Sequence, residues 1–167
     1  MLKIEKLGSD ELRETASAVE TFDDGLKQLV GDMFETMEKA DGVGLAGPQV
    51  NVSKRLFVVE IPGEVKKAFI NPQIVQTSME EVVMEEGCLS LPGLYREVKR
   101  PARVTVQAQD VDGKPFTVTA DGLYGRCIQH EFDHLNGVLF IDHLDPEAKE
   151  QAVDSYNRKH RFGRRRK

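Results

Sequence analysis

Hydrophobic and polar residues recur with two different periods along the chain, and the change of period separates predicted helices from predicted strands. From Asp24 to Ala40, apolar residues recur every three or four positions, as they do on one face of an α-helix. A shorter helix is predicted at 9–16, where Ser9 is a candidate N-cap. The longer segment predicts an amphipathic helix whose core face carries Leu26, Leu29, Val30, Met33, Phe34 and Met37.

The middle of the chain is rich in strand-forming residues. Strand-like runs occur at 55–61, 67–75 and 79–84. Residues 103–120 predict a β-hairpin, because Asp112-Gly113 is a tight-turn signal between two alternating segments.

Helical character returns at 122–135 and again after Asp145, a candidate N-cap followed by Pro146 in the first helical position. This last helix is expected to end near Lys159. The chain contains no internal repeat and no linker-like segment. We therefore expect an α+β fold in one domain over residues 1–167, with mostly antiparallel sheets packed around a central helix and a further helix at the C-terminus.

The composition is that of an ordinary globular protein, with 40% hydrophobic and 31% charged residues. The N-terminus has no apolar signal-like region and no apolar run approaches membrane-spanning length, so we expect a cytoplasmic protein without membrane contact. In a reducing compartment, Cys88 and Cys127 favour metal binding or packing over a disulfide.

The net charge of −5 hides a basic C-terminus. Residues 158–167, RKHRFGRRRK, carry seven Lys and Arg residues and no acid, so the remaining chain is strongly acidic. Such a segment predicts either a frayed, solvated tail or a contact with RNA or another polyanion. Ribosome contact is one form of this prediction, and no sequence-specific nucleic-acid binding is expected.

The segment QHEFDHLNG (129–137) contains two histidines four positions apart. On a helix, His130 and His134 would lie on one face and could share a metal ion. Two surface histidines would be the simpler interpretation if no third ligand were found. Cys127 lies on the same face but about 7–8 Å along the helix axis from the midpoint of the pair, too far for its short side chain. It is expected to be a buried neighbour of the site.

Downstream residues are weaker candidates for the third ligand. The extended protease motif HExxHxxGxxH would need a histidine at position 140, where the chain has Phe140, and His143 is out of register. Glu147 and Glu150 stand where acidic residues are ordinary at the start of a helix. Cys88 remains, after a glycine at the end of a strand-like run. With the two histidines it would leave a fourth position open, as in catalytic metal sites.

Three short blocks, GVGLAGPQ (42–49), EGCLS (86–90) and QHEFDHLNG (129–137), resemble in order and spacing the three signature motifs of the peptide deformylase family. The resemblance extends over roughly residues 2–145. One departure is Gly47, where the family usually has a second alanine, so the first loop is expected to be more flexible.

The resemblance implies hydrolysis of the N-formyl group from N-formylmethionyl nascent peptides, with release of formate, in a bacterial cytoplasm. It implies ferrous iron as the physiological metal, with zinc, nickel or cobalt able to replace it. Glu131, next to His130, is then expected to act as general base and general acid. The backbone N–H of Leu89 and the side-chain amide of Gln49 are expected to stabilise the oxyanion.

The resemblance also implies an extended peptide pairing with the backbone around Gly44. Val43, Leu123 and Cys127 are candidates to line the methionine pocket, with Met84 as a further one.

Two alternatives remain open. The first is a metalloendopeptidase that uses the same water and glutamate. The second is an RNA-binding or ribosome-associated module with a structural metal, which would need four protein ligands and no glutamate.

Overall fold

A computed structural model describes the backbone of residues 1–165 and the side chains of residues 1–160. Three α-helices, seven strands and three short 3₁₀ helices make up this part of the chain. In order they are η1 (Asp10–Arg13), α1 (Asp24–Lys39), β1 (Gly44–Ala46), η2 (Gly47–Val50), β2 (Leu56–Ile61), β3 (Val65–Thr77), β4 (Glu81–Cys88), β5 (Leu91–Pro101), β6 (Arg103–Gln109), β7 (Pro115–Asp121), α2 (Gly122–His134), η3 (Phe140–His143) and α3 (Pro146–Arg165).

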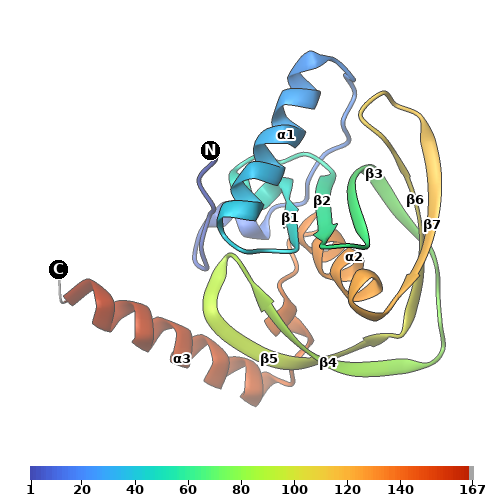
Figure 1. Cartoon of the computed structure of the whole chain (residues 1–167). Helices are drawn as coiled ribbons and strands as arrows, with labels where there is room; N and C mark the ends of the chain where they lie inside the picture. The colour runs from blue at the N-terminus through green and yellow to red at the C-terminus, as the bar shows by residue number, and fades with distance from the viewer. Residues whose placement is uncertain (166–167) are drawn as a thin grey trace.

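The strands form two antiparallel sheets. Five of them pair in the order β1-β2-β3-β6-β7, while β4 and β5 form a separate two-stranded ribbon. Helix α2 lies between the five-stranded sheet and the ribbon (Figure 1). The predicted α+β fold, with mostly antiparallel sheets around a central helix, is therefore confirmed.

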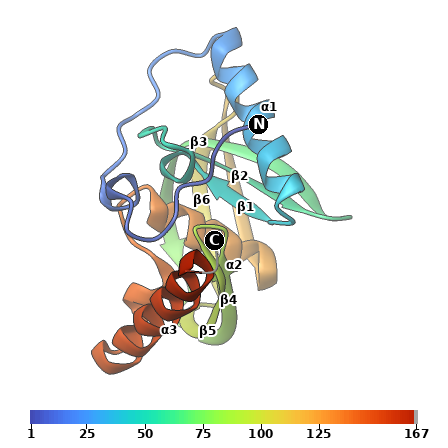
Figure 2. The same ribbon diagram turned by 90° about the vertical axis from the view of Figure 1, so that its left-hand side faces the viewer.

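Strand β2 is at the centre of the packing because both of its faces are covered. Alternate side chains of a strand point to opposite faces. Leu56 and Val58 pack in the cluster that contains the apolar face of α1, whereas Phe57 and Val59 pack in the cluster that contains Ile128 of α2. Figure 2 shows α1 and α2 on opposite sides of this sheet.

A third apolar cluster joins the ribbon to the C-terminal part of the chain. It combines Leu91, Leu94 and Val98 of β5 with Phe140 of η3 and Ala152 of α3. The ribbon thus packs on α3 and η3 through this cluster, while its other contacts reach α2. In this way a long hairpin with little core of its own is fixed over the helix that carries the histidines.

Several local predictions are confirmed. The helix predicted from Asp24 to Ala40 is α1, and the predicted hairpin is β6–β7. The turn of this hairpin is held by Asp110, whose carboxylate accepts hydrogen bonds from the N–H groups of Asp112 and Lys114. Asp145 caps α3 as expected, since its Oδ1 accepts a hydrogen bond from the N–H of Ala148 at 2.8 Å.

Three predictions differ from the structure. Residues 9–16 form only the four-residue η1, where Ser9 makes no capping bond. Strand β5 was not predicted, because its turn-forming residues Pro92 and Gly93 conceal the alternation that follows them. Helix α3 continues to Arg165, so the backbone of the basic segment is helical over its described part rather than frayed; residues 166 and 167 lie outside the described residues.

Within the described residues, no helix combines the length and apolar character required to span a membrane.

Candidate metal centre and active site

The site is assembled from three segments that are distant in the sequence. Helix α2 carries His130, Glu131 and His134, all of them buried. Strand β4 ends at Cys88, and the loop before β2 contributes Gln49 through η2. The helical spacing of the two histidines places their rings 5.2 Å apart, centroid to centroid.

Cys88, His130 and His134 converge as the sequence predicts. One donor atom from each lies within 4.8 Å of the other two, and the Cys88 Sγ is 3.4 Å from the His134 Nε2. Among the described residues this is the cluster of His, Cys, Asp and Glu side chains able to hold a metal ion. Cys127 is outside it: its buried thiol contacts the carbonyl oxygen of Val43 at 3.5 Å.

His130 is oriented by a carboxylate that the sequence analysis did not single out. Its Nδ1 lies 2.9 Å from the Glu86 Oε1, so its other ring nitrogen, Nε2, faces Glu131 at 3.9 Å. A histidine ligand commonly donates its second N–H to such an acceptor, which fixes both tautomer and ring orientation. The available signal was an acidic residue in EGCLS, two positions before the candidate ligand Cys88.

Glu86 is itself held in a buried ion network. Arg100 donates to both of its oxygens, at 2.6 and 2.9 Å, and Arg126 donates to Oε2 at 2.9 Å. Burial alone would raise the pKa of Glu86, but hydrogen bonds from His130 and Arg100 outweigh it and hold the pKa far below its usual value. The carboxylate therefore stays ionised. Arg100 continues the network to Asp133 at 2.8 Å.

Glu131 has the opposite environment. Its side chain is buried, and its Oε1 has no hydrogen-bond partner among the described residues. Burial raises the pKa of Glu131 from 4.5 to about 7; the positive charge of His130 opposes this and the negative charge of Glu86 adds to it. Two carboxylates in one site thus have widely separated pKa values, which is typical of acid–base catalysis.

The Gln49 amide is fixed at both ends. Its Oε1 accepts a hydrogen bond from the N–H of Ala46 at 2.9 Å. Its Nε2 donates to the Ser90 Oγ at 3.1 Å and lies 3.5 Å from the Cys88 Sγ. The N–H₂ group therefore faces the metal-ligand cluster, where a donor could interact with a reacting oxygen.

Two glycines of the first motif are in close contact with their surroundings. A Cβ on Gly44 would lie 2.5 Å from the Glu131 Oε2 and 2.7 Å from the Cys127 Sγ, so only glycine lets β1 approach the helix. A Cβ on Gly47 would lie 2.6 Å from the carbonyl oxygen of Val52. Gly47 is buried and tightly packed, which differs from the loose loop expected there.

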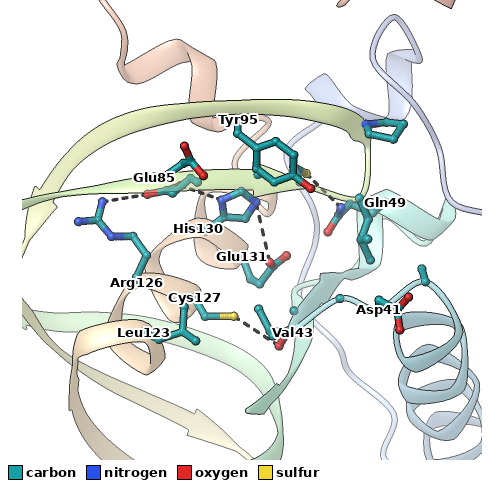
Figure 3. Close-up of a pocket in the computed structure, with 18 of the residues that line it drawn as sticks. Asp41, Val43, Gln49, Glu85, Tyr95, Leu123, Arg126, Cys127, His130 and Glu131 are labelled. Carbon is teal, nitrogen blue, oxygen red and sulfur yellow. Dashed lines mark hydrogen bonds and ion pairs between the residues drawn. The ribbon is translucent and has the colours of Figure 1, made fainter. Parts of the chain in front are cut away.

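A cavity of about 420 Å³ adjoins the cluster and has the predicted residues in its wall. Val43, Gly44, Leu89, Leu123 and Cys127 all line it, together with Gln49, His130 and Glu131. Figure 3 shows Val43 facing Leu123 and Cys127 across the pocket, with Tyr95 over its opposite side. Met84 is not among the lining residues; it borders a second cavity. Tyr95, on the unpredicted strand β5, was missed.

The residues present fit a transition-metal ion. The donor set of one thiolate and two imidazoles suits zinc, iron, nickel or cobalt. The three donor atoms are mutually close, one imidazole is already oriented by Glu86, and the buried Glu131 carboxylate faces the same space.

The model of the family described as polypeptide deformylase matches residues 1–150. The chain belongs to this family. A peptide deformylase of Chromobacterium violaceum is 50% identical over 155 residues, covering 92% of each chain.

Solved structures agree. A peptide deformylase from Legionella pneumophila is 46% identical and covers 99% of this chain and 98% of its own, with a TM-score of 0.92. One from Synechococcus elongatus, in complex with actinonin, is 43% identical and covers 92% of this chain and 86% of its own, with a TM-score of 0.88. The chain is therefore an enzyme of the peptide deformylase family.

Proposed function

We propose that the enzyme hydrolyses the N-formyl group of N-formylmethionyl nascent peptides and releases formate. The observation that carries the proposal is the buried Glu131 carboxylate beside the Cys88/His130/His134 cluster, with an Oε1 that has no hydrogen-bond partner among the described residues. A structural metal would not need an acid–base residue of this kind. The family supplies the class of reaction, and the geometry supports the roles of the residues.

Cys88, His130 and His134 would hold the metal. When bound, a metal ion of this kind supplies Lewis acidity and lowers the pKa of a water molecule from 15.7 to about 7. We propose ferrous iron, the metal that the resemblance to the family implies. Zinc, nickel or cobalt could replace it, because each accepts this donor set. Cys88 is also the residue at which such a site would be open to oxidation.

Glu131 would move the proton. Its carboxylate lies beside the ligand cluster, where it could take a proton from the attacking water and return it to the leaving amine. Its oxygens are buried, so few competing water molecules reach them. Its Oε1, which has no hydrogen-bond partner among the described residues, is the atom we assign to this transfer.

Gln49 and Leu89 would stabilise the tetrahedral oxyanion. The Gln49 N–H₂ group is held toward the cluster by the hydrogen bond from the Ala46 N–H to its Oε1, which would orient it as a donor to the oxyanion. Leu89 follows Cys88 directly and lines the same cavity, so its backbone N–H is available beside the reacting group.

The peptide would add to β1 as an extra strand. β1 is an edge strand, and its Gly44 backbone borders the cavity because no side chain stands between the strand and Glu131. In this orientation the methionine side chain would enter the pocket between Val43, Leu123 and Cys127.

The basic segment 158–167 supports a further proposal, that it brings the enzyme to the ribosome. Helix α3, which carries the first part of this segment, extends to one side of the molecule in Figure 1. We treat residues 1–167 as one catalytic domain bearing this helix. Removing residues 158–167 should weaken ribosome co-sedimentation and spare turnover of short peptides; unchanged co-sedimentation would contradict the contact.

The proposed reaction is tested by formate release from formyl-Met-Ala-Ser, using anaerobically purified protein loaded with ferrous iron. Glu131→Gln keeps the shape of the side chain but removes its base, so we expect a loss of about 10²- to 10⁴-fold in kcat. Absence of release by folded, iron-loaded wild type would contradict the proposal. Equal activity of Glu131→Gln would favour a structural metal, and cleavage of unformylated casein would favour an endopeptidase.

A further inference from the structure

Arg126 lies between two cavities. It is buried in the first turns of α2 and lines the 420 Å³ pocket beside the metal-ligand cluster. It also lines a second cavity of about 350 Å³, bordered by Val82, Met84, Pro101, Ala102, Asp121 and Gly122. Arg126 is the residue that these two linings have in common. Figure 3 shows it beside Leu123 and Cys127, on the side of the pocket away from Gln49.

The guanidinium group of Arg126 is held by three hydrogen bonds. It donates to the Glu86 Oε2 at 2.9 Å, to the carbonyl oxygen of Val98 at 2.8 Å and to that of Val82 at 2.7 Å. These bonds reach both strands of the β4–β5 ribbon. With its polar end tied in this way, the methylene stem is the part of the side chain left to face an apolar ligand.

We infer that Arg126 sets the depth of the methionine pocket by separating it from the second cavity. The inference rests on the proposed function, because it assumes that the first cavity receives the substrate's first side chain. An unbranched side chain of methionine's length would end against the stem of Arg126. A longer chain would need the space beyond it, which three hydrogen bonds keep closed.

The fixed position of the stem makes it effective as a wall. A free lysine or methionine in its place could move aside at small cost, but Arg126 can move only by breaking bonds to a carboxylate and two backbone carbonyls. Glu86 and Val98 are buried in the folded protein, so leaving their acceptor oxygens unpaired is unfavourable. Specificity against longer side chains would therefore come from an ion network and not from apolar packing alone.

The inference is tested with two substrates that differ only in the first side chain: formyl-Met-Ala-Ser and formyl-2-aminooctanoyl-Ala-Ser. The second carries an unbranched six-carbon chain. Arg126→Ala should join the cavities and raise the ratio of kcat/KM for the long substrate to that for the methionine substrate. A methylene in a hydrophobic pocket changes such ratios by about 10- to 200-fold, and we expect a change in this range.

Arg126→Met is the matched control. It removes the charge and all three hydrogen bonds but retains an unbranched side chain of similar volume, so the ratio should rise, and by less than in Arg126→Ala. Met84→Phe combined with Arg126→Ala adds bulk to the wall of the second cavity and should return the ratio toward the wild-type value. If alanine prevents folding, Arg126→Leu should give an intermediate increase.

An unchanged ratio in Arg126→Ala, with both substrates slowed equally, would overturn the inference and leave Arg126 a structural clamp. An equal increase in Arg126→Met would also overturn it, because charge and not volume would then be responsible. If the wild type releases no formate at all, the proposed function fails separately. Calorimetric binding of Met-Ala-Ser and 2-aminooctanoyl-Ala-Ser to the same variants then decides whether Arg126 limits the pocket.

Discussion

The two sides of helix α2 are held by different forces. Toward the five-stranded sheet, Ile128 and Leu135 pack among aromatic and aliphatic side chains such as Phe57 and Val104. Toward the β4–β5 ribbon, the helix presents Arg126, Gln129, His130 and Asp133, which bond to charged groups and backbone carbonyls. One side is held by burial of apolar surface and the other by directional bonds.

The difference separates stability from geometry. Apolar burial stabilises in proportion to area and fixes no single atom. A buried ion network contributes little net stability, since desolvation offsets the attraction, but removing one member leaves an uncompensated charge. The sheet side therefore holds the helix in place, while the ribbon side fixes the orientation of the His130 ring.

The largest effect should come from breaking the ribbon side at its centre. Glu86→Gln leaves Arg100 and Arg126 without their buried carboxylate, at a cost of about 3–5 kcal/mol in unfolding free energy. Loss of the negative charge that accepts from His130 Nδ1 should weaken metal affinity about 10- to 100-fold. Chemical denaturation and competition with a metal chelator measure the two effects. Glu85→Gln, at the exposed neighbouring position, is the control and should leave both nearly unchanged.

Breaking the sheet side should give a different pattern. Ile128 is fully buried, and Ile128→Ala should cost about 2–5 kcal/mol by leaving a cavity. Metal affinity of the folded variant should remain near that of the wild type, because the bond between His130 and Glu86 is intact. A parallel loss of metal affinity would show that the two sides are not separable.

The pKa of Glu131 predicts a pH dependence of the metal-free protein. The pKa is raised from 4.5 to about 7 in the fold, so the group's contribution to stability is present below pH 4.5 and is lost as pH rises through about 7. Glu131→Gln lacks this loss. Between pH 4.5 and pH 8, the unfolding free energy of the wild type should therefore fall by up to about 3 kcal/mol more than that of Glu131→Gln.

Urea unfolding of both proteins between pH 4.5 and pH 8 measures this difference directly. Parallel stability curves would mean that burial does not perturb Glu131 as described.

The smallest effect should come from a surface ion pair. Lys39 and Glu35 are 2.9 Å apart but about half exposed, one turn apart on α1. Solvent screening and lost side-chain entropy limit such pairs, so Lys39→Ala should leave the unfolding free energy nearly unchanged. A loss comparable to that of Glu86→Gln would remove the distinction between buried and exposed charges on which the comparison depends.

Sequence patterns predicted the elements whose information is local. Helix α1, the β6–β7 hairpin and the start of α3 each have a clear period, turn or cap within about 20 residues. The convergence of Cys88 with the two histidines was also predicted, because helical spacing fixes the pair and the other candidates for the third ligand were weaker.

What the sequence did not reveal depends on contacts between distant segments. The roles of Glu86 and Arg126 arise only when the ribbon closes over α2, since their partners are 14 to 44 residues away. Strand β5 owes its stability to pairing with β4 and to packing on α3, not to its own alternation. The tight packing of Gly47 against Val52 likewise follows from tertiary approach.

The most direct test of the account compares the two cysteines by their bond to a metal. Cobalt-substituted wild type should show a thiolate-to-cobalt charge-transfer absorption band together with one bound cobalt per chain. Cys88→Ser should abolish the band, whereas Cys127→Ser should retain it, because only the Cys88 sulfur lies among the histidine nitrogens. A band that survives Cys88→Ser, or disappears in Cys127→Ser, would contradict the proposed metal centre.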